Sequence, residues 1–106
     1  MAQSQMQSFA FKTQAVSTVA LALTAVGGVP FTAAEVLAAD EVYVTVETNP
    51  LRYRTDGTAP DASTGHLVAG TGSFTITGKR DVSQLRLIRQ GGADATVMVT
   101  LRKRIT

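Results

Sequence analysis

Cysteine and tryptophan are absent from this chain of 106 residues, and aromatic residues make up only 6% of it. Without cysteine, the chain can form no disulfide framework, no thiolate metal site and no cysteine nucleophile. The scarcity of aromatic side chains favours thin β-structure with many turns over a large helical core. It also leaves few rings on which a sugar could stack.

Charge is scarce as well. Charged residues amount to 17% of the chain, and the formal net charge is +2. No nucleic-acid-binding module is recognisable, so we expect no specific nucleic acid as a partner. The mostly apolar segment 15–26 is too short to span a bilayer as a helix. We therefore expect no membrane partner either.

Segment 15–26 permits two interpretations. Following a single positive charge at Lys12, it resembles the apolar part of a signal peptide. However, no convincing small-residue cleavage site follows at residues 27–30, which instead break the segment. Apolar residues also alternate with other residues, which predicts a first β-strand with one buried face. The alternating positions are Val19, Leu21, Leu23 and Ala25.

Residues 1–14 predict an extended N-terminal arm. They are rich in Gln and Ser, show no sustained period, and contain too few apolar residues to form a core among themselves. A terminal segment is ordered only when it is tied down. We expect the arm either to dock Phe9 and Phe11 on a neighbouring subunit or to pack back on its own domain. Residues 15–106 then form the domain itself.

The clearest fold signal lies at residues 42–54. Val42, Val44 and Val46 alternate with Tyr43, Thr45 and Glu47, which predicts a strand. Asn49-Pro50 interrupts it because proline has no amide hydrogen and disfavours a helical residue before it. Residues 51–54 alternate again, so we expect a hairpin.

The remainder of the chain continues in the same manner. Thr32 and Glu35 have the spacing of a capping box, which predicts a short helix over residues 33–38 with Val36 and Leu37 covering an open end of the sheets. Further strands are expected at residues 65–68, 73–77, 85–89 and 96–101, separated by turns at 70–72, 78–81 and, of hairpin type, 90–94. About seven short strands predict an all-β, antiparallel β-sandwich, immunoglobulin-like or jelly-roll-like, with one short helix and the arm.

Candidate chemistry is sparse. His66 is the only histidine, and no second histidine or carboxylate cluster stands near it in the sequence. Asp56 and Asp61 flank a loop that could hold calcium, but the spacing of an EF-hand is absent, and Asp56 fits a residue that hydrogen-bonds its own turn. We expect no catalytic residue, no cofactor and no metal, and hence no enzyme.

Arginines at outward strand positions are the main polar feature. Arg52, Arg54 and Arg86 are predicted to share one sheet face, which is either solvated or complementary to an acidic partner subunit. Together with Phe9 and Phe11, they are the candidate partner-binding residues.

Two resemblances accompany these residues. The segment LRYRTDGTAP (51–60) resembles the Tyr-x-x-Asp-Gly-x-x-Pro turn of the immunoglobulin-like accessory domain of chitobiases. This resemblance implies a β-sandwich without catalytic residues. It covers about ten residues and carries over no site.

A broader resemblance runs from about residue 42 to residue 101. The segments VYVTVETNPLRYRTDGTAPDASTGHLVAGTGSFTITG and LRLIRQGGADATVMVTL are similar to small structural proteins of tailed-bacteriophage virions. In those proteins we expect aromatic residues at the C-terminal end, whereas residues 102–106 of this chain are mainly basic.

This resemblance implies a non-enzymatic subunit located in the virion. Its expected role is that of a capsid decoration or cement protein that binds the major capsid protein or other virion subunits and forms a homo-oligomer. A head-to-tail connector or fibre-attachment protein is an alternative. A carbohydrate-binding module acting through Tyr53 and His66 is another.

Overall fold

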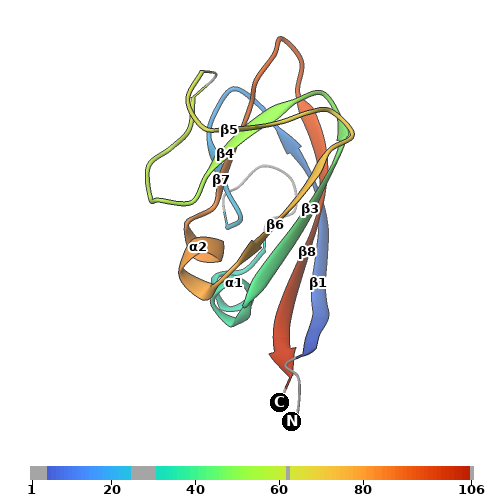
Figure 1. Cartoon of the computed structure of the whole chain (residues 1–106), viewed down its shortest axis with the longest axis vertical. Helices are drawn as coiled ribbons and strands as arrows, with labels where there is room; N and C mark the ends of the chain where they lie inside the picture. The colour runs from blue at the N-terminus through green and yellow to red at the C-terminus, as the bar shows by residue number, and fades with distance from the viewer. Residues whose placement is uncertain (1–4, 25–30, 62, 106) are drawn as a thin grey trace.

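The computed structural model describes residues 5–24, 31–61 and 63–105, which contain eight strands and two short helices (Figure 1). In chain order these elements are β1 (Gln5–Val16), β2 (Leu21–Ala22), α1 (Ala33–Ala38), β3 (Glu41–Thr48), β4 (Leu51–Arg54), β5 (His66–Val68), β6 (Ser73–Thr77), α2 (Lys79–Gln84), β7 (Arg86–Arg89) and β8 (Ala95–Ile105).

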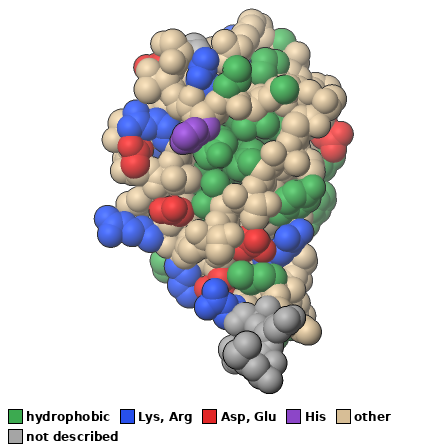
Figure 2. All heavy atoms as spheres, in the orientation of Figure 1, with side chains coloured by type: hydrophobic (Ala, Val, Ile, Leu, Met, Phe, Trp, Pro, Cys, Tyr) green, Lys and Arg blue, Asp and Glu red, His purple; other side chains and the backbone are tan. Residues whose placement is uncertain are grey.

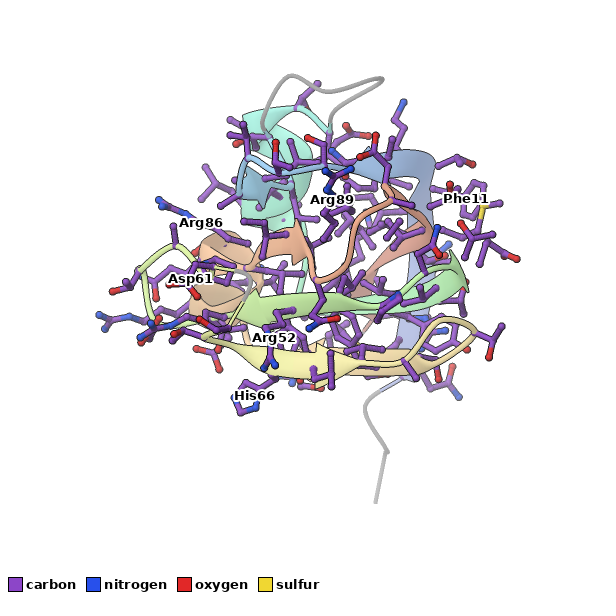
Figure 3. The ribbon with its side chains drawn as sticks, turned by 90° about the horizontal axis from the view of Figure 1, so that it is seen from above. Phe11, Arg52, Asp61, His66, Arg86 and Arg89 are labelled. Carbon is purple, nitrogen blue, oxygen red and sulfur yellow. The ribbon has the colours of Figure 1, made fainter. Side chains whose placement is uncertain are left out.

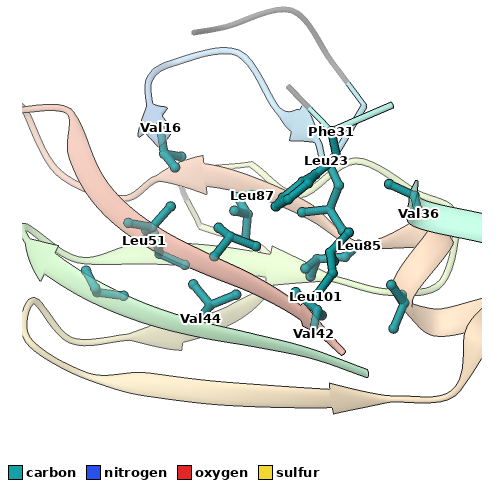
Figure 4. Close-up of a cluster of buried hydrophobic side chains, with 14 of the residues drawn as sticks. Val16, Leu23, Phe31, Val36, Val42, Val44, Leu51, Leu85, Leu87 and Leu101 are labelled. Atoms are coloured by element: carbon teal, nitrogen blue, oxygen red, sulfur yellow. The ribbon is translucent and has the colours of Figure 1, made fainter. Parts of the chain in front are cut away.

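The strands form two antiparallel sheets of four strands each. The first, with the order β1-β8-β3-β6, contains the longest strands and is called the long sheet; the second, with the order β2-β7-β4-β5, is called the short sheet. The two sheets enclose a common core, which Figure 4 shows in close-up. The predicted all-β sandwich is therefore confirmed, with eight described strands where about seven were expected.

The core is built from the alternating positions of the strands. Val42, Val44 and Val46 of β3 are buried, as are the inward residues of β8, which are Ala95, Val97, Val99 and Leu101. The short sheet contributes Leu51 and Leu87 from the opposite side. Because successive side chains of a strand point to opposite faces, the residues between these positions form the outer faces of the sandwich.

The expected hairpin at residues 42–54 is wrong. β3 pairs with β6 and β8 in the long sheet, whereas β4 pairs with β5 and β7 in the short sheet. The turn between them therefore carries the chain from one sheet to the other. Asn49 makes this change of direction with a positive φ of 64°, and its side-chain amide donates to the carbonyl of Asp94 at 3.0 Å.

The turn at residues 90–94 was also expected to close a hairpin, and this too is wrong. It links β7 of the short sheet to β8 of the long sheet. Hence both turns connect strands that face each other across the core. Alternation of side chains identifies the buried face of a strand, but it does not identify the strand that pairs with it.

The helix predicted at residues 33–38 is confirmed as α1, including its capping box: Glu35 N donates to Thr32 Oγ1, and Thr32 N donates to Glu35 Oε1. Val36 is buried, but Leu37 is 68% exposed, so only Val36 covers the core as expected. A second helix, α2, was not predicted. It occupies residues 79–84, where a polar turn at 78–81 was expected to lead into a strand, and it buries Val82.

The strand expected within residues 15–26 is largely absent from the described part of that segment. Val16 ends β1, and only Leu21–Ala22 forms a strand afterwards. Leu21 and Leu23 are buried as predicted, but Val19 is 71% exposed. Residue 25 and the expected break at residues 27–30 lie outside the described residues.

Within the described residues, the predicted N-terminal arm belongs to the domain. Residues 5–14 form most of β1, which pairs with β8 from Gln5↔Ile105 to Val16↔Ala95. The boundary expected at residue 14 therefore falls inside a strand and is wrong. Of the two interpretations of the arm, packing on its own domain agrees with this pairing.

Candidate partner-binding surfaces

The five predicted partner-binding residues lie on different faces of the sandwich. Phe9 and Phe11 belong to β1 of the long sheet, whereas Arg52, Arg54 and Arg86 belong to β4 and β7 of the short sheet. Figure 3 shows Phe11 on the opposite side of the molecule from Arg86. No single partner surface can therefore contain all five.

The outer face of the long sheet is uncharged over its centre, and we call it the neutral face. Phe11, Thr100, Tyr43 and Thr75 form one row across the four strands, and Thr13, Met98, Thr45 and Ser73 form the next. Phe11 is 58% exposed. These side chains combine aromatic, thioether and methyl groups with short hydroxyls, which makes the surface both apolar and able to hydrogen-bond.

Charge is confined to the ends of the neutral face. At one end, the Arg102 guanidinium lies 3.4 Å from Glu41 Oε2 and 5.0 Å from the centre of the Tyr43 ring. At the other end, Glu47 is exposed just before β3 finishes. A neutral centre within a charged rim is the composition of protein interfaces, whose cores are enriched in aromatic residues and Met and depleted of Lys, Glu and Asp.

Phe9 does not share this exposed setting. It sits where the pairing of β1 with β8 shifts register between Ser8 and Ala10. Its ring packs against the core, and the Lys103 ammonium lies 5.3 Å from the ring centre. Phe9 therefore serves the packing of its own domain, whereas Phe11 is open to a partner.

Two arginines of the short sheet, Arg52 and Arg54, bind groups of the chain itself. Arg52 donates to the carbonyl of Gly65 at 2.8 Å, and Arg54 forms a two-bond ion pair with Asp56. The Asp56 carboxylate raises the pKa of Arg54. Arg86 lies directly opposite Arg54 in the register of β7 and β4, so these two residues do share a face as predicted. Arg52 and Arg54 hold the loop of residues 55–65 against the sheet.

Asp56 and Asp61 stabilise the same loop. The hydrogen bonds from Arg54 and then from the Thr58 amide lower the pKa of Asp56. For Asp61, the bond from the Ser63 amide is the main cause of a lowered pKa. Across the described residues, no three His, Asp or Glu side chains gather where they could hold a metal ion. The role of Asp56 in its own turn is thus supported by these contacts.

An open depression of about 420 Å³ lies beside this loop, lined by Arg54, Thr55, Asp56, Thr64, Gly65 and His66. Figure 2 shows His66 at the surface, between charged side chains and a hydrophobic area. The His66 ring is 5.2 Å from that of Tyr53, which in turn stacks on Phe74 of the long sheet at 4.2 Å. A side chain in place of Gly65 would be strained, because the φ of 136° is one that L residues rarely adopt and an added Cβ would lie 3.1 Å from Tyr53 O.

Of the residues of the neutral face, only Phe11 was predicted from the sequence to bind a partner. Its members Tyr43, Thr45, Met98 and Thr100 alternate with buried valines. The same alternation that predicted the core therefore predicts that they point outward. The absence of charge from outward positions was the available signal.

Comparisons with known proteins add no assignment: no protein-family model, curated protein or solved structure matches this chain. Neither helix in the described part of the chain has the length and apolar character needed to cross a membrane.

Proposed function

We propose that this chain is a non-enzymatic structural subunit of a bacteriophage virion, acting as a capsid decoration or cement protein on the head shell. The observation that carries the proposal is the neutral face, an exposed sheet surface with Phe11 at its edge and no charged side chain at its centre. Exposed apolar surface rimmed by polar groups is typical of protein-binding sites. The major capsid protein is the proposed partner.

The resemblance of residues 42–101 to small virion proteins supplies the biological setting of this proposal. The contacts of the described residues indicate which surface would bind the partner. Arg52, Arg54 and Asp56 form hydrogen bonds within the domain, whereas the side chain of Phe11 is exposed. A head-to-tail connector or fibre-attachment protein would use the same surface on a different virion subunit.

Binding to heads tests the proposal directly. The purified chain is mixed with heads of the phage that encodes it, prepared without this protein, and bound chain is measured by co-sedimentation. We expect binding by the original chain and a loss of about tenfold or more in affinity for Phe11→Ser, because truncating an aromatic hot-spot residue of an interface costs about 2 kcal/mol.

Arg86→Ser is the matched control, because Arg86 occupies the opposite face. Its affinity for heads should stay unchanged. Failure of the original chain to bind heads, or equal losses for the two variants, would contradict the proposal. Binding to isolated connector or fibre subunits in place of heads would favour the alternative.

A carbohydrate-binding module is a second candidate, favoured by one observation. The structure brings Tyr53 and His66 together beside the depression, where Thr64 supplies a hydroxyl group. Titration of the chain with neutral oligosaccharides, followed by NMR, tests this candidate. Shifts centred on Gly65 and His66 that disappear in His66→Ala would support it.

A further inference from the structure

β1 is an unusually long open edge for a domain of this size. It has 12 residues, no proline and a single charged residue, Lys12. The other edge strands are shorter, with 2 residues in β2, 3 in β5 and 5 in β6. Exposed edges offer unpaired N–H and C=O groups to other strands, and proteins usually keep such edges short or interrupt them.

Two hydrogen bonds fix the direction of the backbone groups in the long sheet. Asp40 N, just before β3, donates to Arg102 O, so the even-numbered residues of β8 face β3; Val46 N donates to Gly72 O, so the even-numbered residues of β3 face β6. Because the N–H and C=O groups of a strand alternate in direction, the odd-numbered residues face β8.

The same alternation extends to β1. Tyr43 and Thr45 are paired with Thr100 and Met98, so these β8 residues face β3, and the residues between them, such as Val99, face β1. Val99 is paired with Lys12, and Val97 with Gln14. The backbone groups of Phe11, Thr13 and Ala15 consequently point away from the domain, at the open edge.

We propose that β1 is the contact between two copies of this chain, which pair antiparallel about a two-fold axis at Thr13. In this arrangement Thr13 opposes its own counterpart, and Phe11 opposes Ala15 of the second copy. A strand is self-complementary in an antiparallel two-fold pairing, because the same donors and acceptors meet on both sides. The pairing joins the two long sheets into one and extends the neutral face across both copies.

The register follows from two constraints. The register shift between Ser8 and Ala10 confines regular pairing to residues 10–16, and an axis at Thr13 uses that whole segment. An axis at Lys12 would place two ammonium groups directly opposite each other, which is destabilising. With the axis at Thr13, Lys12 instead opposes Gln14.

Charge also favours the antiparallel direction. Arg102, Lys103 and Arg104 lie beside the N-terminal half of β1, from Ser8 to Met6. Antiparallel pairing directs these two basic segments to opposite ends of the joined sheet, roughly 40 Å apart at 3.3 Å per residue. A parallel pairing would bring them together.

This inference deepens the proposed function, on which it rests, by naming a second copy of the chain as one partner. It is tested on the isolated protein, so that failure of self-pairing and failure of head binding are separate results.

Because the chain has no cysteine, a single introduced cysteine reports the contact. In Thr13→Cys, the two Cα atoms at the axis would be about 5.5 Å apart, within the range that a disulfide spans. We expect mild oxidation to cross-link this variant at least about fivefold faster than Thr75→Cys, since an associated pair holds its thiols at a high effective concentration.

Thr75 is the matched control, because it is an exposed threonine on the outer face of β6, the other edge of the same sheet. Equal cross-linking of the two variants, or faster cross-linking of Thr75→Cys, would overturn the proposal.

Thr13→Pro provides a second test, because it removes an amide that faces the open edge and leaves the pairing with β8 intact. A weak contact has a dissociation constant of about 1 mM. Sedimentation of the original chain at protein concentrations up to that value should therefore show dimers. Thr13→Pro should remain monomeric with its melting temperature retained.

Hydrogen exchange gives a residue-level readout for the same samples. Amides of Phe11, Thr13 and Ala15 should become protected as the concentration of the original chain rises. A chain that stays monomeric throughout, with these three amides unprotected, would refute the pairing.

Discussion

The two sheets differ in how they use their outward side chains. On the short sheet, Arg52 and Arg54 turn back to bind the carbonyl of Gly65 and the carboxylate of Asp56, so the charges support a loop of the same chain. At the centre of the long sheet, the outward residues are threonines, Ser73, Phe11, Tyr43 and Met98, none of which is charged. These two charged side chains on the short sheet are thus bound within the chain itself. Charge on a surface does not by itself identify the face that meets a partner.

The two sheets differ on their outer faces only, because their inner faces form one core. We therefore expect Leu51→Ala in the short sheet and Leu101→Ala in the long sheet each to lower the free energy of unfolding by about 3 kcal/mol, the usual cost of emptying a fully buried leucine site. Urea unfolding followed by circular dichroism would measure both. A separate early transition in Leu51→Ala alone would show that the sheets unfold as two units.

The links between the sheets provide the next test. Gly70 lies so close to the crossover between β3 and β4 that an added Cβ would be 2.9 Å from Asn49 N. Gly70→Ala should therefore cost about 2 kcal/mol, in the range of other overpacked sites. Gly91→Ala, in the crossover between β7 and β8, meets no atom within 4 Å and should change stability by less than about 0.5 kcal/mol.

Single outward residues sharpen the contrast between the faces. Arg52→Ala removes a hydrogen bond to the loop and should lower the free energy of unfolding by about 1 kcal/mol. Phe11→Ala removes an exposed side chain and should lie within about 0.5 kcal/mol of the original chain. Thermal unfolding of the two variants measures the difference. A larger loss for Phe11→Ala would mean that the neutral face supports its own domain.

The smallest expected effect concerns pH. The backbone amide of Arg104 donates to Asp40 Oδ2 at 2.7 Å and Lys79 Nζ lies 3.3 Å from Oδ1, so the pKa of Asp40 is lowered, mainly by the Arg104 bond. A lowered folded-state pKa gives stability that is present above the unfolded value of about 3.9 and is lost as the pH falls through the folded value.

Asp40→Asn should therefore flatten the dependence of melting temperature on pH below about pH 4. Glu47→Gln is its control, because Glu47 is exposed at the opposite end of β3. An unchanged pH dependence in Asp40→Asn would mean that this carboxylate does not tie the end of the long sheet to α2.

Strands in which apolar and polar residues alternate regularly could be predicted from the sequence, as β3 and β8 show. β1 was less visible, because its buried position 14 is a glutamine, 3% exposed, where a core residue is usually apolar. α2 was missed because Lys79-Arg80-Asp81 looks like a polar turn and Val82 is its one buried residue. The partner of each strand was beyond prediction, since a turn that closes a hairpin and a turn that crosses the core use the same residues.

The pairing of Gln5 with Ile105 has a practical meaning for engineering. A polypeptide that enters the domain at Gln5 and leaves it at Ile105 does so through adjacent positions. The domain can therefore be grafted into a surface loop of another protein without forcing the ends of that loop apart, and a label attached at either end reports on the same tip of the molecule.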